Sequence, residues 1–139
     1  MDELFVAYYI TSTFADVQIT EAFGYTFFFY STERMLAFAT LGSSDNEYDR
    51  LSNLDRPGVF RLNIGVSRET FIKLFGEGPN NAKADDYTAL DIIMPHPFYA
   101  PQSFICVLNP SEQTVQKVKD LLTEAYGLAV QRHNRKNAR

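Results

Sequence analysis

Residues Leu54 to Gly76 read LDRPGVFRLNIGVSRETFIKLFG, and this stretch decides the fold. It opens with a turn, because Pro57 fixes its φ at about −65° and Gly58 accepts the positive φ that other residues resist. Apolar residues then alternate with other residues over 59–66, a period of two that predicts a strand with one apolar face. The stretch therefore predicts a turn, a strand and a helix, with almost no loop between strand and helix.

The helix at the end of this stretch has signals at both of its ends. Ser67 fits an N-cap, Glu69 lies in the first turn where the helix dipole favours an acid, and Gly76 fits the C′ position. Because the strand runs almost directly into this helix, the polar side chains on the face of the strand opposite its apolar face are held firmly. Arg61 and Asn63 lie on that face and are the first candidate site residues.

The composition predicts one globular domain over residues 1–139. The chain is 45% hydrophobic, and 12 Phe and 8 Tyr supply large rings for a single core. Its formal charge of −4 is uneven, since the last eight residues hold four bases and no acid, which leaves nine bases against seventeen acids before them. That balance of −8 disfavours a nucleic-acid partner for the body of the domain. The basic tail over 132–139 is expected to fray.

Several classes of protein are disfavoured by what the chain lacks. One Cys allows no internal disulfide, and two His with that Cys are too few for an ordinary structural zinc site, so we expect neither a metal nor a cofactor. No apolar run approaches the roughly 18 residues of a membrane span, and the start MDELF lacks the basic region of a signal peptide. These features predict a cytoplasmic protein with no membrane partner.

The remaining pattern predicts an α+β fold. Asp2 can cap a first helix that ends near Phe14, while Asn109, Pro110 and Glu112 fit the N-cap, first and third positions of a long final helix. We therefore expect an antiparallel sheet of about five strands, packed against N-terminal, middle and long C-terminal helices. The other four strands are expected at 17–22, 25–30, 35–41 and 104–108.

Two of these strands, 25–30 and 35–41, are apolar on both faces. This pattern favours helices on one side of the sheet and either a loop or a second subunit on the other, so a homodimer is an alternative to a monomer. The segment 42–53 is polar and acidic and reads as a surface loop, whose acids are expected to be solvated.

Three segments, LDRPGVFRLNIGVSRETF, LDIIMPHPFYAP and VLNPSE, together resemble an uncharacterised bacterial domain family of unknown function. More distantly, the order of helix, hairpin strands, RLNIG-like strand, helix, strand and a final helix ending LLTEAYGLAV resembles the MmcQ/YjbR group. That resemblance implies an α+β fold with an antiparallel sheet, and some members of the group are labelled as DNA-binding. This chain departs from the group in its PHPFYAP loop and in having no Trp.

Two arrangements of residues have the chemistry of a catalytic site. His96 and Asp91 are five residues apart near a stiff proline loop and are candidates for an acid/base pair. We favour the simpler interpretation, in which His96 anchors the loop by hydrogen bonds to the backbone. Cys106 is a candidate nucleophile only if it lies near His96. Because it lies in an apolar strand, we favour the alternative that it is a small buried apolar residue of the core.

Arginines near the central strand suggest an anion site, because a guanidinium offers a planar fork to carboxylate or phosphate. The alternative is an internal network in which Asp55 claims one of the arginines, and we favour that network over an anion site. Our leading hypothesis is a small cytoplasmic binding or interaction domain without enzymatic activity, whose partner is an unidentified small molecule, such as a small anion, or a protein. The alternatives are a nucleic-acid-binding protein of the MmcQ/YjbR type and an enzyme with a site centred on His96. The candidate ligand-binding residues are Arg56, Arg61, Asn63, His96 and Tyr99.

Overall fold

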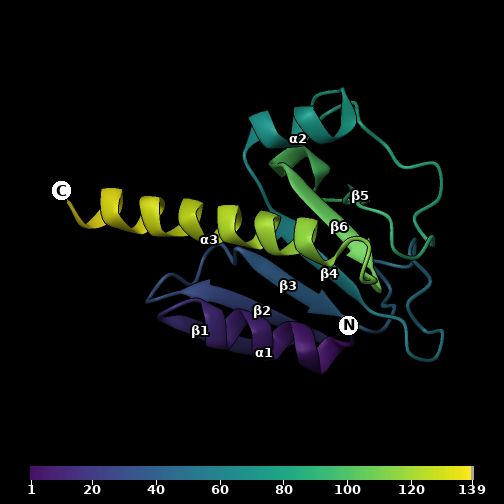
Figure 1. The fold of residues 1–139 in the computed structure, drawn as a ribbon, viewed down its shortest axis with the longest axis horizontal. Helices are drawn as coiled ribbons and strands as arrows, with labels where there is room; N and C mark the ends of the chain where they lie inside the picture. Colours follow the sequence, from purple (N-terminus) through teal and green to yellow (C-terminus); the bar gives the residue numbers. More distant parts are fainter. Residues whose placement is uncertain (139) are drawn as a thin grey trace.

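The computed structural model describes residues 1–138 and has an α+β architecture (Figure 1). All six strands form one antiparallel sheet in the order β1-β2-β3-β4-β6-β5, one strand more than the sequence predicts. The strands are β1 (Val17–Ala22), β2 (Tyr25–Tyr30), β3 (Ala39–Gly42), β4 (Arg61–Gly65), β5 (Met94–Pro95) and β6 (Phe104–Leu108). The helices are α1 (Glu3–Thr13), α2 (Arg68–Phe75), the 3-10 helix η1 (Ala100–Gln102) and α3 (Val115–Asn137).

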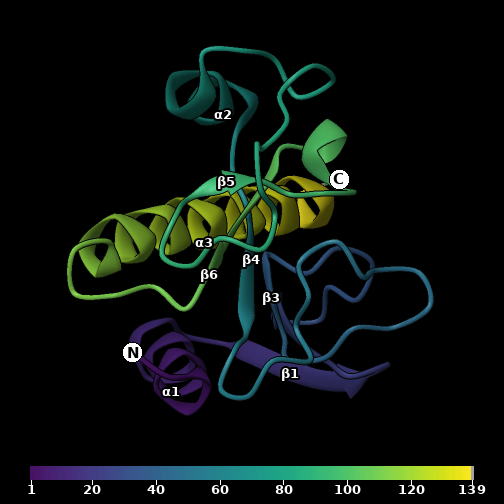
Figure 2. The ribbon, with the colours of Figure 1, turned by 90° about the vertical axis from the view of Figure 1, so that its right-hand side faces the viewer.

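The alternation in β4 divides the sheet into two different faces. Leu62 and Ile64 point to one face, where they pack in the main core with buried residues of α1 and α3. Arg61 and Asn63 point to the other, which the loops around 43–59 and 82–96 cover. Figure 2 shows α1 and the loop between β3 and β4 on opposite sides of the sheet. Of the two covers expected for the second face, a loop or a second subunit, the structure has a loop of the same chain.

Helix α1 lies beside α3 on the first face, and the two run in the same direction. The Lys119 ammonium, in the first third of α3, lies 5.0 Å from the centre of the Tyr9 ring in the second half of α1. At the end of α1 the Phe14 and Tyr126 rings stack at 4.7 Å, and the Tyr126 hydroxyl donates to the carbonyl of Ala15 at 2.7 Å. Because Tyr126 is the midpoint of α3, the second half of α3 extends past α1 (Figure 1).

The local signals around α2 are confirmed. The Ser67 hydroxyl accepts a hydrogen bond from the backbone N–H of Thr70, and Gly76 has a φ of 74°. The strand Phe104–Leu108 is also confirmed at both ends. The predicted strand over 35–41 is shorter, since the ladder includes only Ala39–Gly42.

The predicted start of the last helix is wrong. α3 begins at Val115 after Thr114, whereas Asn109 has a φ of 43° and caps nothing. The Asn109 amide instead accepts from the N–H of Phe60 at 2.9 Å and donates to the carbonyl of Gly58 at 2.8 Å. Two contacts distant in sequence satisfy this side chain, so the helix starts later.

The other end of α3 lies in the basic tail over 132–139. The helix continues through Arg132 to Asn137, so the described part of the basic tail is helical, and its fraying stays a prediction. Position 139 lies outside the described residues. Over residues 1–138, no helix combines the length and the apolar character that crossing a membrane requires.

Candidate functional site

A buried ion pair lies on the loop-covered face of the sheet. The Arg61 guanidinium is fully buried, and Asp49 meets it with both carboxylate oxygens. Nη1 donates to Oδ1 at 3.1 Å and Nη2 donates to Oδ2 at 2.5 Å. This bidentate geometry, through the two terminal nitrogens, is the strong form of an arginine–carboxylate pair.

The rest of the guanidinium is also occupied. Nε of Arg61 donates to Oδ1 of Asn63 at 2.8 Å, and Nη1 also donates to Oγ of Ser52 at 2.9 Å. Four of the five guanidinium N–H groups therefore have protein acceptors. This set of bonds leaves Arg61 almost no capacity to bind an external anion.

Two further side chains connect this ion pair to neighbouring strands. The Asn63 amide nitrogen donates to Oγ1 of Thr40 on β3 at 2.9 Å, and the Tyr25 hydroxyl on β2 donates to Oδ2 of Asp49 at 2.8 Å. Together these bonds fasten the 43–59 loop to β2 and β4 and link β4 to β3. We call the group the Arg61 cluster, which consists of Tyr25, Thr40, Asp49, Ser52, Arg61 and Asn63.

The ionisable groups of the Arg61 cluster are held in one protonation state. Burial raises the pKa of Tyr25 to about 12, and the nearby Asp49 carboxylate adds to this effect. Burial also opposes ionisation of Asp49, but hydrogen bonds and charge from Arg61 outweigh it and hold the pKa of that carboxyl below its usual range. At neutral pH the cluster contains a phenol, a carboxylate and a guanidinium, and none of them exchanges a proton readily.

His96 lies near this cluster, and its backbone N–H donates to the carbonyl of Phe104 on β6 at 3.0 Å. Its Nδ1 accepts hydrogen bonds from the backbone N–H groups of Phe98 and Tyr99, both at 3.0 Å. Burial, together with the positive charge of Arg61, lowers the pKa of His96 to about 3. The ring is therefore neutral at physiological pH, and the hydrogen bonds to Nδ1 assign its proton to Nε2.

The Nε2–H group of His96 reaches the surface. Nε2 has no hydrogen-bond partner among residues 1–138, yet every fully buried polar side-chain atom in that part of the chain has one. The 2% of the His96 residue that is exposed must therefore include part of Nε2. Two half-exposed rings lie around it, with Tyr99 at 5.0 Å and Phe98 at 6.5 Å between centroids.

The structure brings the predicted site residues together only in part. Arg61 and Asn63 are bonded to each other, and Tyr99 lies against His96. Arg56 is separate, since its guanidinium donates to the backbone carbonyls of three loop residues. These acceptors are Ser52 at 3.1 Å, Asn53 at 2.8 Å and Thr88 at 2.9 Å.

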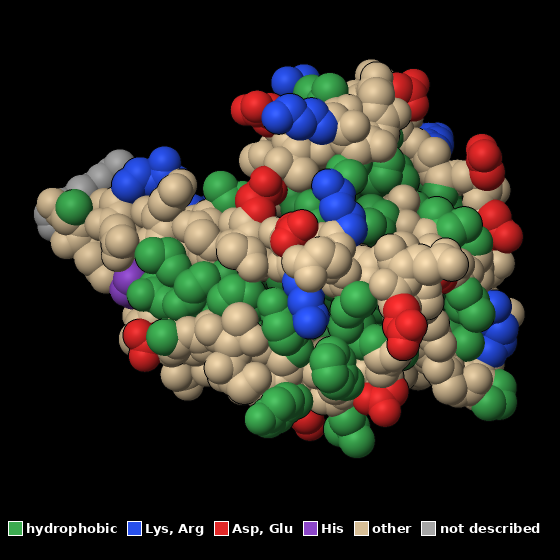
Figure 3. All heavy atoms as spheres, viewed as in Figure 1, with side chains coloured by type: hydrophobic (Ala, Val, Ile, Leu, Met, Phe, Trp, Pro, Cys, Tyr) green, Lys and Arg blue, Asp and Glu red, His purple; other side chains and the backbone are tan. Residues whose placement is uncertain are grey.

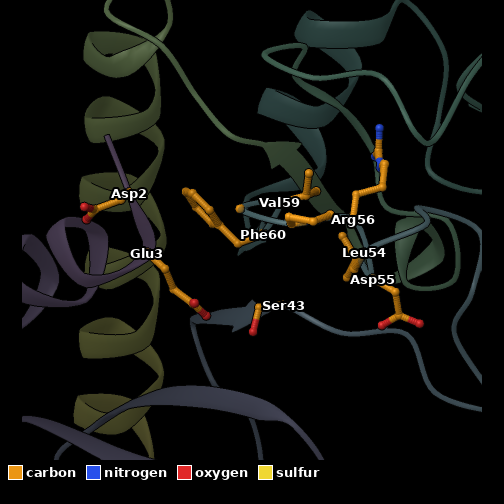
Figure 4. Close-up of a pocket in the computed structure, with 10 residues that line it drawn as sticks. Asp2, Glu3, Ser43, Leu54, Asp55, Arg56, Val59 and Phe60 are labelled. Atoms are coloured by element: carbon orange, nitrogen blue, oxygen red, sulfur yellow. The ribbon is translucent and has the colours of Figure 1, made fainter.

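A shallow cavity of about 420 Å³ lies beside Arg56, between the start of α1 and the turn before β4 (Figure 4). Asp2, Glu3 and Asp55 are among the residues that line it, while the Arg56 guanidinium points away from it toward its backbone acceptors. This cavity therefore presents acids rather than a base, which does not suit an anion.

Two predictions about acidic residues are wrong. Asp49, expected to be solvated, is buried and is the partner of Arg61, whereas Asp55 accepts from the N–H of Asp45. The less favoured alternative, an acid/base pair of Asp91 with His96, does not form, because the Asp91 carboxylate accepts from the N–H and the hydroxyl of Ser111 before α3, at 2.7 Å and 2.5 Å.

Cys106 is buried as expected, and burial raises its thiol pKa to about 12. Within residues 1–138, no three His, Cys, Asp or Glu side chains are grouped so that they could hold a metal ion. The polar groups that sequence reasoning missed are mainly Asp49 and Ser52. No local pattern identifies them, since they lie in an irregular loop and meet Arg61 only in the folded chain.

These features define a small α+β domain with a buried, hydrogen-bonded ion pair and a neutral, almost fully buried histidine. The chain belongs to a family of unknown function, DUF6194, whose model matches residues 1–138. No curated protein and no solved structure matches the chain. The distant likeness to the MmcQ/YjbR group stays a prediction.

Proposed function

We propose that this protein is a binding domain without enzymatic activity, and that its ligand lies against His96. The observation that carries the proposal is the Nε2–H group, a donor that reaches the surface beside the half-exposed rings of Phe98 and Tyr99. A donor beside aromatic rings is suited to a flat or apolar ligand with one hydrogen-bond acceptor. The domain acts in the cytoplasm under this proposal.

The state of the nearby groups favours binding over catalysis. A histidine that acts as a general base must offer a free nitrogen lone pair near neutral pH. In His96 the lone pair of Nδ1 is used by two backbone N–H groups, and Nε2 carries the proton. The Cys106 thiol, with a pKa of about 12, offers no thiolate.

The same geometry narrows the class of ligand. Arg61 and Asn63 are used within the Arg61 cluster, so in this proposal they position the sheet beneath His96 and do not contact the ligand. Because Asp49 neutralises Arg61, the ligand needs an acceptor rather than a high negative charge. A carboxylate or a carbonyl attached to a ring satisfies these conditions.

Two measurements test this function. Native mass spectrometry of the freshly purified chain should show a retained small molecule that is lost in His96→Gln. An NMR titration with benzoate should shift the Nε2–H signal of His96, whereas benzylamine, which has a similar ring and the opposite charge, should not. Tyr99→Ser should weaken the benzoate effect, and Tyr48→Ser is the matched control, because Tyr48 is exposed on another loop. If benzoate leaves the His96 signal unchanged, the proposal that the ligand binds at His96 is wrong.

Nucleic-acid binding of the MmcQ/YjbR type is the second candidate, and one observation favours it. The projecting end of α3 carries Arg132, Arg135 and Lys136. Binding through these residues should weaken steeply between low and physiological salt, because phosphate contacts release counterions. Fluorescence anisotropy with a labelled duplex tests this candidate, and the absence of salt-sensitive binding rules it out.

A further inference from the structure

Helix α1 has an apolar side that faces away from its own core. Val6 and Ile10 are buried against the sheet, but Leu4 is 82% exposed, Tyr8 is 70% exposed and Phe5 is 45% exposed. A helix of a globular protein normally presents polar residues on the side opposite its core. The three exposed side chains, Leu4, Phe5 and Tyr8, form what we call the α1 patch.

Charges of opposite sign lie at the two ends of this side of the molecule. Acidic residues surround the starts of the two parallel helices, where Asp2, Phe5, Glu112 and Val115 line a groove of about 420 Å³. Lys119 also lines the groove, and its ammonium is engaged over the Tyr9 ring. Figure 3 shows hydrophobic and acidic side chains over α1 and basic side chains at the far end of α3.

The basic end of α3 has few contacts with its own chain, namely the Lys136–Glu33 ion pair at 4.0 Å and one aromatic contact. The Tyr30 and His133 rings meet at 5.2 Å, and residues 134–138 beyond this contact are all exposed. The end of a helix without tertiary packing is only marginally stable in water. Arg135 lies on this exposed end.

Gly127 lies next to the midpoint of α3 and faces away from the sheet. A Cβ at this position would meet nothing within 4 Å, so packing within the chain does not require a glycine here. Glycine in a helix interior costs about 1 kcal/mol relative to alanine. A glycine that the fold itself does not need suits the close approach of another backbone.

We propose that this side of the molecule binds a second copy of the chain about a twofold axis near Gly127. The two α3 helices then run antiparallel and approach each other closely at their glycines. The projecting basic end of each α3 lies over the α1 patch and the acidic groove of its partner. Arginine suits this position, because its guanidinium stacks on aromatic rings while its stem covers apolar surface.

Cross-linking at the axis tests the arrangement directly. In the proposed dimer, Gly127→Cys brings two thiols together, so a short bis-maleimide should convert the chain to covalent dimer. Lys73→Cys, exposed on α2, is the control and should stay monomeric, and the buried Cys106 should not react in either variant. Equal cross-linking in the two variants, or none in Gly127→Cys, would overturn the proposal.

Charge reversal tests the pairing of the two ends. Sedimentation velocity on the full chain should show a dimer. Arg135→Glu should weaken the dimer and raise its dissociation constant by about tenfold. Glu112→Arg, at an exposed position in the acidic groove, should act similarly, and combining the two reversals should restore most of the affinity. The proposal is wrong if the chain stays monomeric up to about 100 µM, or if neither charge reversal changes the dissociation constant of the dimer. If a monomer instead binds DNA through Arg135 in a salt-sensitive way, the basic end of α3 binds nucleic acid and the dimer proposal is wrong.

Discussion

Asp49 lies twelve residues before Arg61 in the sequence, yet its carboxylate binds both terminal nitrogens of that buried guanidinium. Tyr25 donates a further bond to Asp49, and Ser52 and Asn63 accept bonds from Arg61. Both charges are therefore removed from water and compensated almost entirely by the protein. The cost of burying either charge appears only when its partner is lost.

Asp49→Ala should destabilise the fold by about 3–5 kcal/mol, because it leaves a buried and unpaired guanidinium. Urea unfolding measures the loss. Asp55→Ala is the matched control from the same loop, since Asp55 is exposed and accepts only one backbone bond, and should cost much less. The double variant Asp49→Leu with Arg61→Met should lose less than the sum of the single variants, and an additive loss would contradict the coupling.

The stability of the protein should fall in mild acid because of His96. Burial and the charge of Arg61 lower its pKa to about 3 in the folded chain, against an ordinary value of 6.5. Below pH 6.5 the unfolded chain therefore takes up a proton that the folded chain does not. The free energy of unfolding should decrease as the pH falls from about 6.5 toward about 3, with a slope of up to about 1.4 kcal/mol per pH unit.

His96→Gln should remove most of this slope. Urea unfolding of the two proteins between about pH 6.5 and 5 measures the difference, and His133→Gln shows how much of it belongs to the other histidine. An equal slope in His96→Gln and in the unaltered chain would mean that His96 takes up a proton in the folded state.

Gly42→Ala should destabilise the protein by about 1–3 kcal/mol. A Cβ at position 42 would lie 2.5 Å from Cε1 of the Tyr25 ring, so the ring must move and its bond to Asp49 is disturbed. Gly127→Ala is the matched control, because its Cβ meets nothing within 4 Å, and it should raise the stability of the monomer at low protein concentration. Thermal unfolding with a near-UV signal from tyrosine measures both effects, and a neutral Gly42→Ala would contradict the contact.

Asp91→Ala should loosen the start of α3 and cost about 1–2 kcal/mol, the range of a lost helix cap. Its carboxylate accepts from the N–H and hydroxyl of Ser111 and from the hydroxyl of Thr114. Hydrogen exchange at the first turn of α3 should speed up more than exchange elsewhere. Asp86→Ala is the control, because Asp86 bonds only to Thr88 in its own loop, and equal exchange in the two variants would contradict this role.

Features that depend on neighbouring residues could be predicted from the sequence. The period of two placed β4 correctly to within two residues at its start and one at its end, and the two caps of α2 were found because their bonds lie within three or four residues of each other. The predicted start of α3 failed for the opposite reason. Asn109 is a good N-cap residue, but its side chain bonds to residues about fifty positions earlier.

The sequence by itself determined the α+β class, the order of its main elements and the polar face of β4, since each depends on short-range periodicity and capping. Only the tertiary structure decided what the polar residues do. It placed Asp49 against Arg61 and left Nε2 of His96 at the surface. Burial and the partner of a charged group set its protonation and its availability, and both arise only when distant segments pack together.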